Sequence, residues 1–188
     1  MVKKIFFFFV DTIQSLVFAA SIFILFYLFI AQPNQVNGHS MMPNFQDKAL
    51  LLTDKVTYHF RQPERGDVVV FKAPSSEPCS EDECEYIKRV IGLPGENIRL
   101  SDGKVFVNDI LLIENYLSPN TITNPGAYFP ANQEVALLQN NYALFGDNRS
   151  NSRDSREFGP IAKTALVGKA FFVYWPINYA GLVPATSY

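Results

Sequence analysis

The chain has 188 residues and a formal net charge of −2, its sequence pI is near 5.7, and hydrophobic residues make up 48% of it. This length allows one membrane anchor and one globular unit with its own core, but not a second full domain. The charge balance lacks the excess of Lys and Arg that neutralises phosphates, which argues against nucleic acid as a partner.

Apolar residues are concentrated at the N-terminus. No charged side chain occurs from Thr12 to Ala31, and about 20 helical residues cross the hydrocarbon core of a bilayer. We therefore expect a transmembrane helix over residues 12–31, after a short cytoplasmic or interfacial N-terminus of residues 1–11. A cleaved signal peptide is the alternative, but the apolar run is longer than usual for one, and no small-x-small cleavage site follows it in residues 32–35.

The positive charges around this segment predict its orientation. Lys3 and Lys4 precede it, and no positive residue follows it before Lys48. Because positive residues are retained on the cytoplasmic side, the N-terminus is expected there and the rest of the chain across the membrane.

The remaining residues, 32–188, break into short runs rich in β-branched and aromatic residues, after a polar connector over residues 32–38. The runs expected to form strands are 50–52, 67–71, 86–91, 98–100, 104–107, 110–113, 142–145 and 167–174. Ser101-Asp102-Gly103 predicts a hairpin, and residues 114–141 read as a long loop. The prediction is a mainly β fold: an antiparallel, barrel-like unit with a smaller inserted β subdomain over about residues 97–141, carried on one helix.

Two cysteines, Cys79 and Cys84, flank a short acidic loop. On the translocated side of a membrane such thiols tend to be oxidised, so the two cysteines could close a small disulfide ring. Free thiols are the alternative. The cysteines and the two histidines, His39 and His59, lack the paired spacings of zinc sites, so no metal is expected.

Ser40 and Lys88 are the candidates for chemistry. A serine hydroxyl is a weak nucleophile until a base removes its proton, and lysine can do this only when neutral. Its pKa, roughly 10.4 in solution, must then fall, which burial can achieve. Strand alternation places Lys88 on one face with Tyr86 and Val90, between largely apolar neighbours. A lysine in a strand more commonly reaches solvent or protects an edge, and a lone serine is equally ordinary.

A third segment, residues 146–161, is dense in polar and charged side chains and follows a predicted buried strand. As plain structure it is a loop of Asx turns and surface ion pairs. Loops held by a rigid sheet also commonly carry catalytic groups.

Four ordered segments together resemble bacterial type I signal peptidase, a membrane-bound Ser/Lys endopeptidase that removes signal peptides from exported proteins. Ser40-Met41-Met42-Pro43 is similar to its nucleophile motif, and residues 65–71 to the next strand. Residues 88–96 are similar to its base motif and residues 146–161 to its last motif.

The resemblance implies a role for each matching residue. Ser40 would attack the scissile carbonyl, and Lys88 would take its proton and later activate the deacylating water. Ser152 would orient the lysine amine, and Asp154 and Arg156 would form an ion pair that supports the loop. No metal or organic cofactor is implied.

The resemblance also implies an oxyanion site and substrate pockets. Gly38 stands where some family members carry a serine as second oxyanion donor, so that donor is in doubt here. Val36, Tyr86 and Ile87 match positions lining the pockets for small residues, typically alanine, at the first and third positions before the cut. The implied partners are preproteins with signal peptides, the lipid bilayer and the protein-export machinery. The implied place is the bacterial inner membrane, crossed once, with the catalytic unit on the translocated side.

Two other interpretations stay open. A Ser-His-Asp peptidase would use His39 or His59 as base, although His39 and Ser40 are adjacent and their side chains point apart in an extended segment. A non-catalytic anchored β module that binds a partner would need no deprotonated lysine.

Overall fold

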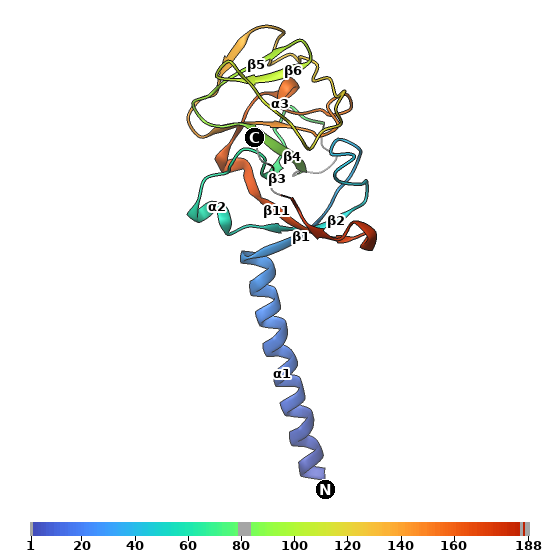
Figure 1. Cartoon of the computed structure of the whole chain (residues 1–188). Helices are drawn as coiled ribbons and strands as arrows, with labels where there is room; N and C mark the ends of the chain where they lie inside the picture. The colour runs from blue at the N-terminus through green and yellow to red at the C-terminus, as the bar shows by residue number, and fades with distance from the viewer. Residues whose placement is uncertain (1, 79–83, 185, 187–188) are drawn as a thin grey trace.

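The computed structural model describes residues 2–78, 84–184 and 186. Its first element is helix α1 (Val2–Phe29), which projects from the β-rich remainder as a long rod (Figure 1). In the described part of the chain, one helix is long and apolar enough to cross a membrane, over Lys3–Leu25. Apart from Ile30 and Ala31, the span predicted to cross lies within α1, and Ala31 instead begins the first strand.

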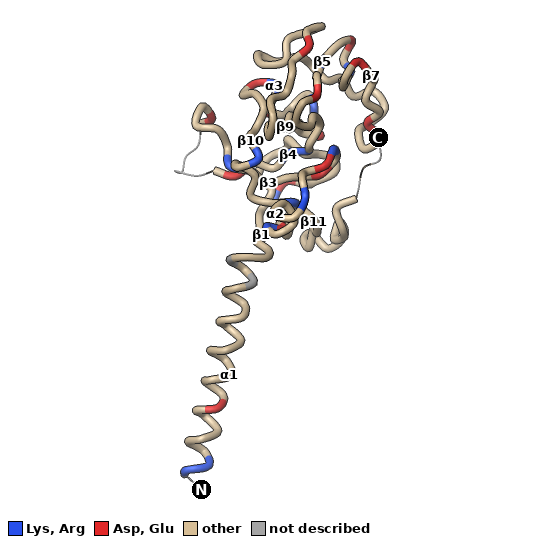
Figure 2. The backbone as a smooth tube through the Cα atoms, turned by 90° about the vertical axis from the view of Figure 1, so that its left-hand side faces the viewer, with Lys and Arg blue, Asp and Glu red and all other residues tan. Residues whose placement is uncertain are grey.

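Charged side chains are distributed very unevenly along the molecule. Figure 2 marks a few charged residues at the start of α1 and the others on the β-rich part. The described side chains along the rest of α1 are mostly apolar and exposed, because no other described element packs along them. A surface of this kind is unfavourable in water.

An eight-stranded antiparallel sheet dominates the β-rich part, in the order β1-β2-β11-β3-β4-β9-β10, with β12 pairing β11. Register shifts interrupt the ladders of β11 with both neighbours, and such bulges bend a strand. The mainly β prediction is therefore confirmed. The strands are β1 (Ala31–Gln35), β2 (Leu50–Asp54), β3 (Val68–Lys72), β4 (Glu85–Gly92), β9 (Asn141–Phe145), β10 (Ile161–Ala162), β11 (Leu166–Trp175) and β12 (Gly181–Leu182).

A second sheet of four strands is built from the middle of the chain, in the order β7-β6-β5-β8. Its strands are β5 (Asn97–Ser101), β6 (Lys104–Val107), β7 (Ile110–Leu111) and β8 (Glu134–Ala136). Asp102 and Gly103 both have positive φ and join β5 to β6, so the predicted hairpin forms. The division of the chain into a catalytic unit and a smaller subdomain stays a prediction.

Four short helices complete the fold: α2 (Thr57–Phe60), α3 (Ser155–Phe158) and two 3₁₀ turns, η1 (Lys163–Ala165) and η2 (Ile177–Tyr179). Cys84, just before β4, is disulfide-bonded, and no described cysteine is free. Cys79, the other cysteine predicted to pair or stay free, lies outside the described residues.

The core fixes the two segments that carry the candidate residues. Val36, Met41 and Phe45 surround Ser40 in sequence and are all buried in one cluster with residues of β2, β3 and β11. The second half of β4, Lys88–Gly92, is buried, whereas its first residue, Glu85, is exposed. Ile87 of β4 packs against this cluster, whereas Val90 and Ile91 belong to two other buried clusters.

Four strands were not predicted: the two-residue strands β10 and β12, and the longer strands β1 and β8. Residues 31–35, within and just before the expected polar connector, form β1 by pairing with β2, and residues 134–136 of the expected long loop form β8. In each case the backbone of a neighbouring strand supplies the hydrogen bonds, although the side chains are mostly polar or exposed.

Candidate active site

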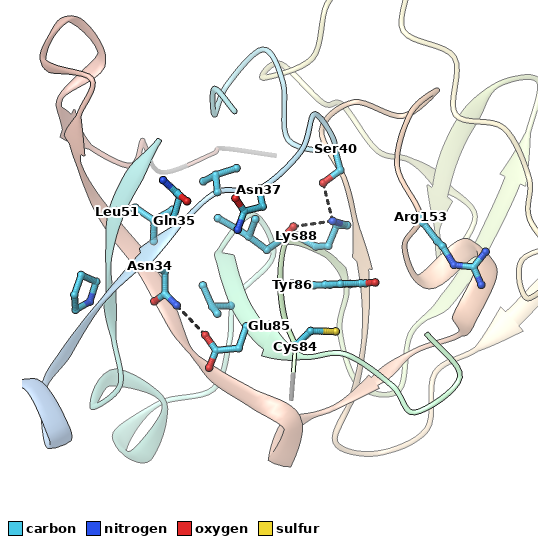
Figure 3. A pocket seen from close by; sticks show the side chains of 14 residues that line it. Asn34, Gln35, Asn37, Ser40, Leu51, Cys84, Glu85, Tyr86, Lys88 and Arg153 are labelled. Atoms are coloured by element: carbon cyan, nitrogen blue, oxygen red, sulfur yellow. Dashed lines mark hydrogen bonds between the residues drawn. The ribbon is translucent and has the colours of Figure 1, made fainter. Parts of the chain in front are cut away.

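Ser40 lies in a tight turn after β1. Gly38 adopts φ +95°, a conformation that favours glycine, and its N–H donates to Asp47 Oδ1 at 2.7 Å. On the other side of Ser40, Met41 is fully buried and its carbonyl accepts from the Phe45 N–H at 2.9 Å. The turn is therefore held at both ends, and the Ser40 hydroxyl faces a cleft (Figure 3).

Lys88 reaches Ser40 from β4. Its Nζ donates to Ser40 Oγ at 2.8 Å and to the Ile87 carbonyl at 2.9 Å, and both contacts are drawn in Figure 3. The residue is only 4% exposed. The structure therefore brings together the hydroxyl and the amine that the sequence analysis selected from positions 48 residues apart.

Burial lowers the pKa of Lys88 from 10.5 to about 8. The cause is the loss of hydration of the ammonium form, which outweighs the attraction of nearby carboxylates, Asp154 first and Asp147 second. Arg156 adds to the lowering. With this pKa about one amine in ten is neutral at pH 7, against fewer than about one in a thousand at the solution value.

A buried ion pair fixes the backbone next to the lysine. Arg89 bonds Asp147 through two nitrogens, at 2.8 and 2.6 Å, and both side chains are almost fully buried. Asn44, four residues after Ser40, donates to the same carboxylate at 2.9 Å. Asp147 therefore joins three segments: the turn that carries Ser40, the strand that carries Lys88 and the loop that follows β9.

That loop contains the predicted supporting residues. Asp154 and Arg156 form a two-contact ion pair, with both distances 2.8 Å, and Asp154 also accepts from the Gly146 N–H at 2.9 Å. Ser152 Oγ is buried and has no hydrogen-bond partner among the described residues. The contact expected between Ser152 and Lys88 is thus not formed here, because the amine is directed to Ser40 and Ile87 instead.

A second polar network was not predicted from the sequence. Arg149 is buried and bonds Glu114, Thr123 Oγ1 (2.7 Å) and Tyr116 Oη (2.9 Å), and its pKa is raised by the Glu114 carboxylate although burial opposes this. Its partners come from the stretch that reads as a plain loop. The only sequence feature that indicated buried polar contacts was the density of charged residues in residues 146–161, the segment that contains Arg149.

The cleft beside Ser40 has a volume of about 710 Å³. Val36, Tyr86 and Ile87, the predicted pocket residues, all line it, as do Ser40 and Lys88. Its remaining lining residues are Pro33, Asn34, Gln35, Asn37, Leu51, Val70, Cys84, Glu85 and Arg153. A concave site with two interacting reactive groups has the form of an active site.

Neither histidine takes part in this arrangement. His39 and His59 are exposed, neither lines the cleft, and the hydroxyl of Ser40 is engaged by Lys88. The geometry therefore opposes a Ser-His-Asp triad. In the part of the chain that the structure describes, no group of three or more His, Cys, Asp or Glu side chains could hold a metal ion.

Residues 9–175 match the family model described as "Signal peptidase, peptidase S26". The chain belongs to this family. It is 37% identical to a probable signal peptidase I-2 of Synechocystis, over 82% of this chain and 68% of that one. It is 36% identical to a signal peptidase I of Leptolyngbya laminosa, over 85% of this chain and 77% of the relative.

A relative from a third bacterium and a solved structure are also similar to this chain. Signal peptidase I T of Bacillus subtilis is 32% identical, over 88% of this chain and 84% of the relative. A crystal structure of a signal peptidase I from Enterococcus faecalis matches with a TM-score of 0.46 and 27% identity, over 58% of this chain and 97% of that one. As a member of the signal peptidase family, the chain is a peptide-bond hydrolase of the signal peptidase I type, whose substrates are preproteins with signal peptides.

Proposed function

We propose that this signal peptidase is a membrane-anchored serine endopeptidase in which Ser40 is the nucleophile and Lys88 the general base. The observation that carries the proposal is the 2.8 Å contact between Lys88 Nζ and Ser40 Oγ, made by an amine that is almost fully buried. A base must lie within hydrogen-bond reach of the proton that it removes and have a pKa near the working pH. Lys88 meets both requirements.

In the acylation step, the Ser40 O–H donates to the lone pair of the neutral Lys88 amine. Oγ attacks the scissile carbonyl carbon as its proton moves to Nζ, which gives a tetrahedral oxyanion and an ammonium. Collapse of this intermediate breaks the C–N bond, and the ammonium returns the proton to the departing amine of the mature protein. An ester between Ser40 and the signal peptide remains.

In the deacylation step, the neutral amine accepts a proton from a water molecule that attacks the ester carbonyl. Collapse of the second tetrahedral intermediate breaks the bond to Oγ, which regains a proton from Nζ. The signal peptide leaves with a new carboxylate. Each step uses the same amine in both protonation states, as a pKa of about 8 permits.

The backbone N–H of Ser40 is suited to stabilise the oxyanion, because it donates to no other group in the described residues. The loss of one such donor costs about 10²–10³ in rate. The Gly38 N–H is already bonded to Asp47, and a glycine has no hydroxyl. The second donor is therefore not Gly38.

We assign supporting roles to the loop after β9. Asp154 and Arg156 hold the Gly146 backbone against the nucleophile turn, where a Cβ on Gly146 would meet the Ser40 carbonyl oxygen at 2.5 Å. Ser152 Oγ would meet the same Cβ at 2.1 Å, so it lies at the edge of the site. Its free hydroxyl would bond the amine when the proton moves.

We propose that the substrates carry small residues before the scissile bond, in the pattern Ala-x-Ala. Val36, Tyr86 and Ile87 narrow the cleft next to the reactive pair. The exclusion of one methylene from such a pocket discriminates by only about 1–3 kcal/mol, so the position of the substrate relative to the bilayer must add to specificity.

The anchor supplies that position in this proposal. α1 spans the inner membrane with its N-terminus in the cytoplasm, and the catalytic unit faces the translocated side, where the export machinery delivers preproteins. Support comes from the length and exposed apolar surface of α1, although a signal sequence passes the same test. Alkaline carbonate extraction of the expressed full chain is expected to leave it in the membrane pellet. Release of the intact chain into the supernatant would contradict anchoring.

The catalytic assignment is tested with purified full-length protein and a preprotein in detergent. We expect Ser40→Ala and Lys88→Met each to lower kcat/KM by at least about 10³-fold, as removal of a catalytic nucleophile or base does in other serine peptidases. Lys104→Met is the matched control, since it removes an exposed strand lysine far from the cleft. Cleavage by Lys88→Met within tenfold of the wild-type rate would overturn the assignment.

A further inference from the structure

A polar bridge crosses the cleft at one end. Asn34 Nδ2 donates to Glu85 Oε2 at 2.7 Å, and Gln32 Nε2 points at the same oxygen at 3.4 Å (Figure 3 shows the first contact). Asn34 is itself oriented, because its Oδ1 accepts from Thr53 Oγ1 at 2.8 Å. We call Gln32, Asn34 and Glu85 the clasp.

The clasp joins two strands that are not neighbours in the sheet. Among the described strands, β1 pairs with β2 alone, and β4 pairs with β9 only from Arg89 onward. Residues 85–88 of β4 therefore have an open edge on the side that faces β1. Two open strand edges across a cleft are suited to receive an extended peptide, which forms backbone hydrogen bonds with them. The clasp spans that space by side chains alone.

The clasp also lies toward the membrane end of the cleft. Gln32 and Asn34 follow the last residue of α1, Phe29, by only a few positions, whereas Ser40 is beyond the end of β1. Under the proposed function, the apolar part of the substrate precedes the cut and occupies the same bilayer as α1. The substrate must then pass the clasp before it reaches Ser40.

We propose that the clasp opens for the substrate and that the Glu85 carboxylate then selects the residue about four positions before the scissile bond. Glu85 precedes Lys88 by three residues, or about 10 Å along β4, and a substrate strand beside it rises by the same amount per residue. With the first residue before the cut beside Lys88, the fourth lies beside Glu85. This inference rests on the proposed function.

The chemistry of the clasp defines what is selected. A carboxylate accepts hydrogen bonds but donates none, so it favours Lys, Arg, Gln or Asn in the substrate and disfavours Asp or Glu. Glu85 is exposed, and an exposed hydrogen bond to Asn34 is readily exchanged for one to a substrate. The expected preference is correspondingly modest, about fivefold or less, as for an exposed ion pair.

The test compares three peptides that differ only at the fourth position before the cut, with Lys, Ala or Glu there. For the full-length wild type in detergent, we expect kcat/KM to be about fivefold higher for the Lys than for the Glu peptide, and the ratio to shrink in high salt. Glu85→Gln is expected to bring the ratio close to one. Lys72, which faces Glu85 on β3, is present in both proteins.

Two further variants separate selection from a general loss of structure. Asn34→Asp keeps an acceptor for Thr53 but replaces the clasp donor by a second carboxylate, so the ratio should rise above the wild-type value. Glu134→Gln removes one exposed carboxylate from β8, outside the cleft, and should leave the ratio unchanged. A merely structural role of the clasp would lower cleavage of all three peptides equally.

The outcomes distinguish this inference from the proposed function. Equal cleavage of the Lys and Glu peptides by the wild type, or an unchanged ratio in Glu85→Gln, would overturn the role of Glu85 while cleavage of the Ala peptide upholds the proposed function. A wild type that cleaves none of the three peptides would overturn both.

Discussion

The outer end of β4, at Glu85, and its inner end, which begins at Lys88, differ in almost every physical respect, although Glu85 precedes Lys88 by only three positions. At the inner end, Lys88 is 4% exposed and its neighbour Arg89 is locked to Asp147 by two short hydrogen bonds. At the outer end, Glu85 is exposed, and its carboxylate accepts hydrogen bonds from Asn34 and Gln32 across the cleft. The same strand therefore has a buried end, where the lysine can lose its proton, and a solvent-exposed end, where side-chain hydrogen bonds can be exchanged.

The difference shows what each task requires. A general base needs a fixed position and a lowered pKa, and both come from burial. Selection of an incoming chain needs groups that remain hydrated and replaceable. If this comparison is correct, changes around the inner end should have large effects, and those at the outer end small ones.

Apart from changes to Ser40 and Lys88 themselves, the largest effect is expected at Gly146, which separates the Ser40 turn from the loop after β9. A Cβ at this position would lie 2.1 Å from Ser152 Oγ and 2.5 Å from the Ser40 carbonyl oxygen. Gly146→Ala should therefore push the two segments apart and lower kcat/KM by about 10²-fold or more, as small displacements of catalytic groups do. The measurement is steady-state cleavage of a preprotein.

Gly181→Ala is the matched control for that change. The added Cβ would meet nothing within 4 Å, and Gly181 lies in β12, away from the cleft. Its activity should equal that of the wild type. Wild-type activity of Gly146→Ala would show that the inner end is not tightly packed around Ser40.

The next effect concerns the stability cost of the buried lysine. The pKa of Lys88 is lower in the folded than in the unfolded chain, so the unfolded chain binds the Lys88 proton more tightly. The free energy of unfolding should therefore rise between about pH 8 and about pH 10.5, as this proton is lost. Below pH 8 the cost is fully present. Lys88→Met should therefore raise the free energy of unfolding at pH 7 by up to about 3 kcal/mol.

Chemical denaturation of wild type and Lys88→Met at pH 7 and pH 10 measures this directly. The stability difference between the two proteins should be smaller at the higher pH. If Lys88→Met were less stable than the wild type at both pH values, the buried amine would stabilise the fold. That result would contradict the stability cost expected for the inner end of β4.

Strands could be predicted where a run of apolar side chains indicates burial. They were harder to predict where only backbone pairing with a neighbouring strand forms them. The apolar runs of β3, β4 and β11 were recognised from composition. β1 was not, because Gln32, Pro33 and Asn34 have low strand propensity and acquire their structure from β2. The same holds for Glu134 in β8.

A smaller effect than at Gly146 is expected at Ser152. Its hydroxyl has no hydrogen-bond partner in the described residues, so Ser152→Ala should change the free energy of unfolding by less than about 1 kcal/mol. If the hydroxyl bonds the amine only during proton transfer, kcat should nevertheless fall by about tenfold or more. A kcat equal to that of the wild type would remove Ser152 from the mechanism.

The site was predictable in its reactive pair but not in its support. Resemblance selected Ser40 and Lys88, and strand alternation accounted for the apolar surroundings of the amine. No local pattern marks Glu114 as the partner of Arg149, because the two residues are far apart in sequence and meet only in the folded chain. Glu77 was missed for the same reason, although its buried carboxylate bonds Arg153.

The proposed mechanism depends most directly on the protonation of Lys88. A pH titration of its side-chain ¹³C or ¹⁵N resonance by NMR, on the full-length protein in detergent, measures the pKa, with the Lys88→Met spectrum identifying the signal. We expect a midpoint near pH 8. A midpoint close to the solution value of 10.5 would contradict it, because the amine would then be charged at neutral pH and unable to accept the Ser40 proton.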